Sequence, residues 1–173
     1  IAAATEVDFD LDNATPASGA LRKRCQALIE SVEDTMGGLA TGAIALLRPL
    51  VDAGLIPADF PVCLPSISGY SGGGRTMMEA YEAGSAPAME LYALGLKHKH
   101  VPEIMRYTGL QRRPLFVPSV GNFAQGMLVQ LPLHLDTLPG KPTAQALHDA
   151  LQKHYAGSEW VTVEPATADL KLD

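Results

Sequence analysis

The stretch Phe60-Pro-Val-Cys-Leu-Pro-Ser-Ile-Ser-Gly-Tyr-Ser-Gly-Gly-Gly-Arg75 decides the fold of this 173-residue chain. Residues 60–68 predict a strand, and the glycine-rich segment that follows predicts a turn. A helix is expected directly after the turn, over residues 76–82. The chain is therefore expected to build a sheet with helices packed against it.

Helices and strands on both sides of this stretch define the fold class. Helices are expected at 40–52, kinked at Pro49 and ended by Gly54, and at 143–155, capped by Thr143. Strands are expected at 115–118, 125–135 and 160–164, with an extended segment at 94–100. Because these elements interleave without a regular alternation, we expect an α+β fold with a mixed, largely antiparallel sheet and helices packed on one face.

The N-terminal part has its own pattern. Val7, Phe9 and Leu11 alternate with acidic residues, which predicts a half-buried strand. A second apolar pattern, at helical spacing over residues 21–36, predicts an amphipathic helix that ends at the glycine pair 37–38.

Composition excludes several classes of protein. Hydrophobic residues make up 47% and charged residues 18%, which is typical of one globular domain. The net charge is -6, and the longest basic run is Arg22-Lys-Arg24, which argues against nucleic acid or a membrane as partner. The two cysteines, Cys25 and Cys63, are interpreted as buried apolar side chains in a reducing, cytoplasmic protein.

Two clusters of residues could carry chemistry. The backbone of Gly72, Gly73 and Gly74, together with Arg75, could hold a small phosphorylated ligand or anion, and the alternative is a tight turn whose arginine pairs with a surface carboxylate. His98 and His100 would share one face of an extended segment, with Glu103 close behind. No third ligand accompanies this pair, so no metal is expected.

Three segments in fixed order identify a family resemblance: Thr41-Gly-Ala-Ile-Ala-Leu-Leu-Arg-Pro-Leu50, Ser68-Gly-Tyr-Ser-Gly-Gly-Gly-Arg75 and Lys97-His-Lys-His-Val-Pro-Glu-Ile104. Together with segments 118–127, 132–140 and 154–157, they resemble the short form of N-acetyl-γ-glutamyl-phosphate reductase. The similarity is nearly continuous from about Gly37 to Leu172.

The resemblance implies a dehydrogenase of arginine biosynthesis that reduces an acyl phosphate to an aldehyde with NADPH. It also implies the fold of the C-terminal domain of glyceraldehyde-3-phosphate dehydrogenase. A cysteine thiolate attacks the acyl phosphate, and one of His98 and His100 handles protons, with Glu103 in its setting. The substrate-binding set implied by the resemblance is Ser68, Ser71, Gly72, Gly73, Gly74 and Arg75.

Two departures from the family pattern predict an inactive chain. Where the family has Pro-Gly-Cys-Tyr-Pro-Thr-Gly, this sequence has Met36-Gly-Gly-Leu-Ala-Thr-Gly42, so Gly38 occupies the position of the nucleophile. Without a thiolate no thioester forms. No segment has the strand, glycine fingerprint and helix of a dinucleotide site, so we expect the chain to bind no cofactor.

The segment Leu11-Asp-Asn-Ala-Thr-Pro-Ala-Ser-Gly-Ala20 resembles the C-terminal stretch of the family, although Thr15-Pro16 replaces its usual Lys-Gly. We therefore expect one domain over 1–173, in which 1–36 corresponds to the family C-terminus and 37–173 to the catalytic domain. An engineered, circularly permuted domain without its cofactor-binding half would explain this order.

Three hypotheses follow. The chain is a reductase-derived domain that is inactive alone, a weak hydrolase that uses the histidines and Arg75, or a structural module for self-association. We expect a homodimer or a dimer of dimers, formed through the strands around 115–135, with Val129 or Leu131 facing the partner.

Overall fold

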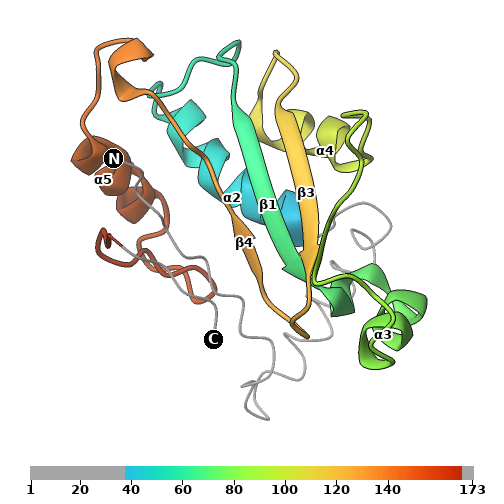
Figure 1. Ribbon diagram of the computed structural model, residues 1–173. Helices are drawn as coiled ribbons and strands as arrows, with labels where there is room; N and C mark the ends of the chain where they lie inside the picture. The colour runs from blue at the N-terminus through green and yellow to red at the C-terminus, as the bar shows by residue number, and fades with distance from the viewer. Residues whose placement is uncertain (1–37, 169–173) are drawn as a thin grey trace, which may run out of the picture.

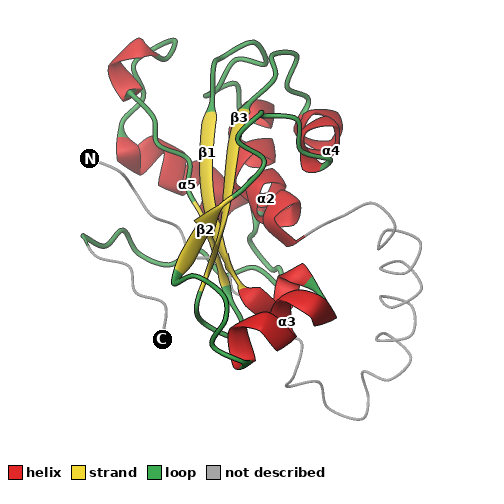
Figure 2. Cartoon of the chain, turned by 45° about the vertical axis from the view of Figure 1, so that its right-hand side comes forward, coloured by secondary structure: helices red, strands yellow, loops and turns green. Residues whose placement is uncertain are grey.

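A computed structural model describes residues 38–168 of the chain. The strand and helix expected over 5–11 and 21–36 lie outside these residues. The described part contains a four-stranded sheet in the order β2-β3-β1-β4; Figure 1 labels β3, β1 and β4, and Figure 2 labels β2. The strands are β1 (Cys63–Gly69), β2 (Met89–Leu91), β3 (Leu115–Gly121) and β4 (Met127–Val129).

The sheet is mixed. Its two central strands, β1 and β3, are parallel, with Leu64 paired to Phe116. Each outer strand is antiparallel to its neighbour: β4 pairs with β1, and β2 pairs with β3. The expected α+β class with a largely antiparallel sheet is confirmed.

Four α-helices complete the described fold. They are α2 (Gly38–Asp52), α3 (Arg75–Glu82), α4 (His100–Thr108) and α5 (Ala144–His154), and two short 3-10 turns, η2 (Tyr70–Gly73) and η3 (Leu135–Thr137), lie between them. Figure 2 shows α2 and α4 on the same side of the sheet. None of the helices within 38–168 has the length and apolar character needed to cross a membrane.

The core lies between this side of the sheet and the helices. Leu64 and Phe116 point into it from β1 and β3, and Leu47 and Ile104 meet them from α2 and α4. All four side chains are at most 1% exposed. Leu147 and Leu151 of α5 join the same cluster, so the periodic apolar residues of α2, α4 and α5 face the core.

A proline inside α2 explains one link between helices. Pro49 has no N–H to donate to the carbonyl of Ala45, four residues earlier. The Tyr155 hydroxyl donates to that carbonyl at 2.8 Å. Tyr155 follows α5 directly, so its hydrogen bond joins the end of α5 to the interior of α2.

Three of the expected strands differ in the structure. The extended segment at 94–100 is wrong: residues 94–99 turn, with positive φ at Ala93 and Leu96, and α4 begins at His100. The strand at 125–135 is reduced to Met127–Val129, and Pro132 cannot extend its ladder. The strand at 160–164 does not form, because the N–H groups of Trp160 and Val161 donate to the Ser158 hydroxyl.

The other side of the sheet has no helix over it in the described part of the chain (Figure 1). Alternate residues of a strand point to opposite faces, so the residues directly before and after Leu64 and Phe116 have their side chains on this side of the sheet. We call this surface the open face. Its apolar residues are Cys63, Pro65, Ile67, Leu115, Val117, Leu128, Met89 and Leu91.

Candidate functional site

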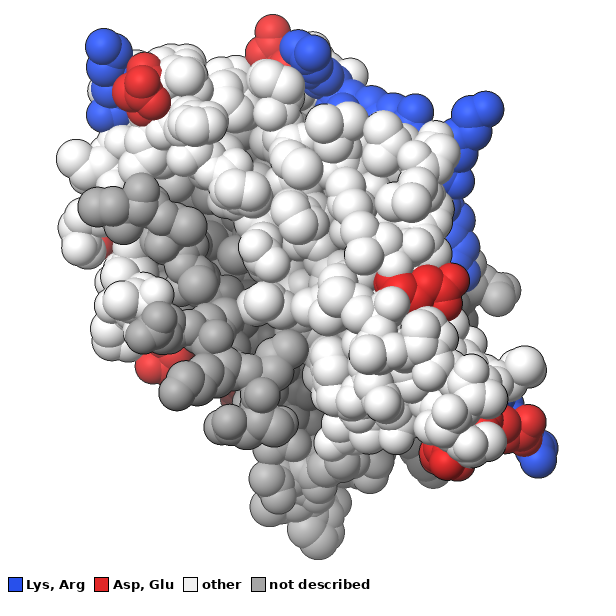
Figure 3. Space-filling model, viewed as in Figure 1, with Lys and Arg blue, Asp and Glu red and all other residues white. Residues whose placement is uncertain are grey.

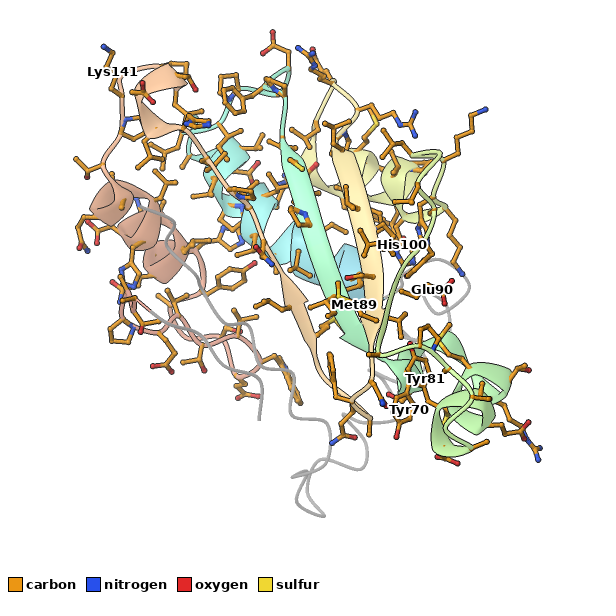
Figure 4. The ribbon with its side chains drawn as sticks, viewed as in Figure 1. Tyr70, Tyr81, Met89, Glu90, His100 and Lys141 are labelled. Atoms are coloured by element: carbon orange, nitrogen blue, oxygen red, sulfur yellow. The ribbon has the colours of Figure 1, made fainter. Side chains whose placement is uncertain are left out.

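The glycine loop at the end of β1 is held by a second loop. The N–H groups of Gly69, Tyr70 and Ser71 donate to the carbonyls of Gly126, Phe123 and Ala124, at 2.8–3.0 Å. A side chain at Gly69 would lie 2.8 Å from three backbone atoms of residues 123–125, so glycine permits this close approach. Tyr70 then stacks on Tyr81 of α3, with ring centroids 4.9 Å apart (Figure 4).

The second half of this loop, residues 73–78, has contacts within the segment itself. The N–H groups of Met77 and Met78 both donate to the carbonyl of Gly74, and the Met77 side chain fills the space beside Gly73. The side chain of Arg75 is 92% exposed and forms an ion pair with Glu79, 2.8 Å from Nε to Oε1. This geometry corresponds to the tight-turn alternative. A phosphate site at Ser68, Ser71 and Gly72–Arg75 stays a prediction.

Gly38, the position matched to the nucleophile, is exposed and begins α2. A side chain added there would meet the end of the Met127 side chain. Met127 pairs with Ser68 in the sheet, so position 38 lies near the carboxyl end of β1, where the glycine loop starts. Position 38 and the loop therefore lie at the same end of the sheet.

The two histidines are brought together, although not in an extended segment. Their ring centroids are 4.4 Å apart in an edge-to-face arrangement. His100 is buried at the start of α4 and lies beside β3 (Figure 4). The His100 N–H donates to Nδ1 of His98 at 3.1 Å.

Two aromatic side chains enclose the pair. The ring of Phe116 on β3 lies 5.2 Å from the His98 ring and 5.8 Å from the His100 ring, and the Tyr92 ring lies 5.7 Å from His98. Glu103, one turn along α4 from His100, is 9% exposed. His98 and His100 therefore lie together at the start of α4 beside β3, and Glu103 lies one turn further along the helix.

Burial keeps the imidazoles neutral. It lowers the pKa of His100 to about 4, and the neighbouring His98 and Lys99 add to the shift. The pKa of His98 is lowered by burial and then by Lys99. Burial raises the pKa of the Tyr92 hydroxyl, so Tyr92 is neutral as well. At neutral pH the side chains of His98, His100 and Tyr92 are therefore uncharged hydrogen-bonding groups.

The sequence does not predict Tyr92 and Phe116 as neighbours of the histidines, because no periodic pattern connects either residue to His98 or His100. The signals for α4 were present: Pro102 and Glu103 suit a first helical turn, and Gly109 adopts the left-handed conformation that ends a helix. These signals indicate that His100 begins a helix and that the two histidines do not lie on one extended segment.

Part of the backbone of the glycine loop has internal partners: the N–H groups of residues 69–71 donate to carbonyls of residues 123–126, and those of Met77 and Met78 donate to the carbonyl of Gly74. The expectation that the chain binds no cofactor stays a prediction. No group of three or more metal-binding side chains occurs within residues 38–168.

Comparison with known proteins identifies the domain. The family model of the semialdehyde dehydrogenase dimerisation domain matches residues 39–172, which nearly coincides with the range of the expected resemblance.

Curated relatives agree with the match. The chain is 51% identical over 132 residues to N-acetyl-gamma-glutamyl-phosphate reductase 2 of Pseudomonas putida, which covers 75% of this chain and 42% of the relative. It is 51% identical over 141 residues to the reductase of Brucella anthropi (79% and 45%), and 56% identical over 127 residues to that of Chelativorans sp. (72% and 41%). The chain thus spans less than half of the length of these relatives. It belongs to the family of semialdehyde dehydrogenase dimerisation domains.

Proposed function

We propose that this chain is a self-association domain that pairs through its open face. The observation that carries the proposal is the apolar character of this face. Leu115, Met89 and Leu91 are each 50–51% exposed there. Figure 3, viewed as in Figure 1, shows the Lys, Arg, Asp and Glu side chains around the margin of this side of the molecule.

The match to a dimerisation domain supports this proposal. A sheet needs cover on both of its faces when both are apolar, and a second copy of the same surface provides cover of matching shape and polarity. The pairing is expected to be two-fold symmetric. Val129 and Leu131, earlier expected as candidates for the interface, pack against the core cluster, so Leu128 is the β4 residue of the open face.

Sedimentation velocity over a range of concentrations tests the proposal. The wild-type chain is expected to sediment as a dimer or larger oligomer, and Val117→Glu, which places a carboxylate in the centre of the open face, is expected to sediment as a monomer. Gln152→Glu on the exposed side of α5 is the matched control and should leave the oligomer unchanged. A wild-type chain that is monomeric at tens of micromolar, roughly the weak end of functional self-association, contradicts the proposal.

We further propose that the chain derives from an N-acetyl-γ-glutamyl-phosphate reductase and is inactive by itself. Gly38 supports this, because it lies at the helix start that corresponds to the nucleophile and has no side chain. A thiol at this position would extend toward the end of the Met127 side chain, and Met127 is 40% exposed. The proposal includes an absence of NADPH binding, and no observation favours the alternative of a weak hydrolase.

A Gly38→Cys variant tests this assignment. Incubated with N-acetylglutamyl phosphate and quenched, it is expected to carry one acyl group at residue 38, detected by mass spectrometry of its peptides. The wild-type chain, which has Cys25 and Cys63, is the control for nonspecific acylation. Acylation of residue 38 no faster than that of Cys63 contradicts the assignment. Neither chain is expected to oxidise NADPH, and calorimetric titration with NADPH should show no binding.

A further inference from the structure

The hydrogen bond between His98 and the start of α4 determines which nitrogen of His98 carries the proton. The donor is the backbone N–H of His100, the first residue of α4, and the acceptor is Nδ1 of His98, at 3.1 Å. A backbone N–H cannot act as an acceptor, so Nδ1 must present a lone pair to it.

We propose that His98 is held as its Nε2–H tautomer by the first N–H group of α4, and that it acts as a hydrogen-bond donor and not as a base. With Nδ1 engaged as acceptor, the neutral ring has its proton on Nε2. The group that His98 serves is then an acceptor: a carbonyl, carboxylate or phosphate oxygen. This inference concerns the histidine itself, so it stands or fails independently of Gly38 and of self-association.

The surroundings of His98 support this state. Lys99 is the N-cap residue of α4 and makes no side-chain capping hydrogen bond, and the ring of His98 supplies an acceptor for the N–H of the first residue of the helix. A protonated imidazolium would turn a second N–H toward the N–H of His100 and break this bond. The partial positive charge of the α4 N-terminus opposes the cation as well.

The ring contacts restrict rotation that would exchange the two nitrogens. The ring of His98 contacts the rings of Tyr92 and Phe116, and it meets the ring of His100 in an edge-to-face arrangement. The lowered pKa of His98 agrees with a ring that stays neutral. His100 differs from it, since its own Nδ1 is buried without a hydrogen-bond partner. The two histidines are therefore not equivalent, and His98 is the one whose tautomer is fixed.

Nitrogen-15 NMR of the full chain tests the proposal directly. In a long-range proton–nitrogen correlation at neutral pH, His98 is expected to show a protonated Nε2 and an unprotonated Nδ1. The signals are assigned with His98→Gln, and the exposed His134 is the internal reference for an unconstrained ring. An Nδ1–H tautomer for His98, or the same tautomer mixture as His134, overturns the proposal.

A pair of variants tests the role of the helix start. His98→Asn keeps an acceptor at the position of Nδ1, whereas His98→Ala removes it. The amide hydrogen of His100 is expected to exchange faster in the alanine variant, on the order of tenfold, because it loses a hydrogen bond. The asparagine variant should exchange like the wild type. Equal exchange in wild type and the alanine variant overturns the proposal, and the tautomer measurement on the wild-type chain remains decisive if the alanine variant does not fold.

Discussion

Two glycines of α2 face β4, and they differ in what a larger side chain would meet. At Gly38 a methyl group would meet the flexible end of Met127. At Gly42 it would lie 2.8 Å from Cγ2 of Val129, a β-branched side chain with few alternative rotamers. Gly42 therefore allows α2 and β4 to approach closely. At Gly38 the packing does not require glycine in the same way, and the consequence of having no side chain there is the absence of a nucleophile.

Substitution of Gly42 with alanine is expected to destabilise the domain although alanine favours helices. The gain in helix propensity is about 1 kcal/mol, and overpacking against Val129 costs about 1–3 kcal/mol. Urea denaturation should give a lower free energy of unfolding for Gly42→Ala than for Gly38→Ala. Val129→Ala should cost less in the Gly42→Ala background than alone. A Gly42→Ala chain stabilised by the full helix-propensity gain would show that α2 and β4 do not pack as described.

His100 makes stability depend on pH. In the unfolded chain a histidine has a pKa of about 6.5. In the folded domain burial lowers the pKa of His100 to about 4. Between these values the unfolded chain binds a proton that the folded one does not, so the free energy of unfolding falls as the pH falls through this window. Above it both states are neutral and the effect is absent.

Urea midpoints at neutral pH and near pH 5 measure this dependence. The wild-type midpoint should be lower at acidic pH, and the difference should shrink in His100→Gln. His134→Gln, at an exposed position, is the control and should retain the wild-type difference. An unchanged pH dependence in His100→Gln would mean that other groups account for the acid sensitivity.

At the scale of elements, the link between α2 and α5 depends on Pro49. The carbonyl of Ala45 is buried, and the Tyr155 hydroxyl is a donor to it in place of the missing N–H of residue 49. Tyr155→Phe should therefore lower the free energy of unfolding by about 1–2 kcal/mol, because the carbonyl loses a hydrogen bond.

Pro49→Ala supplies the N–H from within the helix, so Tyr155→Phe should cost less in that background. The coupling energy from the four chains, measured by urea denaturation, isolates this interaction. Tyr107→Phe, at an exposed tyrosine, should cost little in either background. Equal costs of Tyr155→Phe with and without Pro49 would show that the hydroxyl does not replace the helical N–H.

Local signals explain which elements were predictable. Residues 63–82 follow the expected order of strand, glycine turn and helix because their apolar pattern and glycines act over a few residues. Thr143 caps α5 as expected, with its hydroxyl 3.2 Å from the N–H of Ala146. The prediction of an extended segment at 94–100 is wrong, because the sequence pattern there is short and the path of the backbone depends on positive φ at Ala93 and Leu96.

The candidate site was less predictable than the fold. His98 and His100 were expected together, and they are adjacent, but their mutual geometry follows from α4 and from Phe116. No spacing rule relates Phe116 to residue 98, because Phe116 reaches the histidines from β3, a strand distant from them in the sequence. For Arg75 the sequence left two alternatives open, and its ion pair with the i, i+4 carboxylate of Glu79 corresponds to the second, a surface pair beside a tight turn.

At the scale of the whole molecule, the two faces of the sheet set the behaviour of the domain. Helices α2 and α4 cover one face, and the open face remains apolar over its central strands (Figures 1 and 3). The central strand β1 contributes Leu64 to the core and Ile67 to the open face, so residues of the same strand belong to the two surfaces. Self-association would therefore stabilise the strands that also carry the candidate site.

This arrangement predicts that thermal stability depends on protein concentration. If a dimer unfolds to two separate chains, mass action raises the melting temperature as concentration rises. For a chain of this size the increase should be on the order of 2 °C per tenfold change in concentration. Differential scanning fluorimetry or calorimetry over a hundredfold range should show it for the wild type and for Gln152→Glu. Val117→Glu should melt at a lower temperature that no longer changes with concentration, because its folded state is a monomer. A wild-type melting temperature that is constant over the same range would mean that the open face does not hold two chains together, whatever its apolar character.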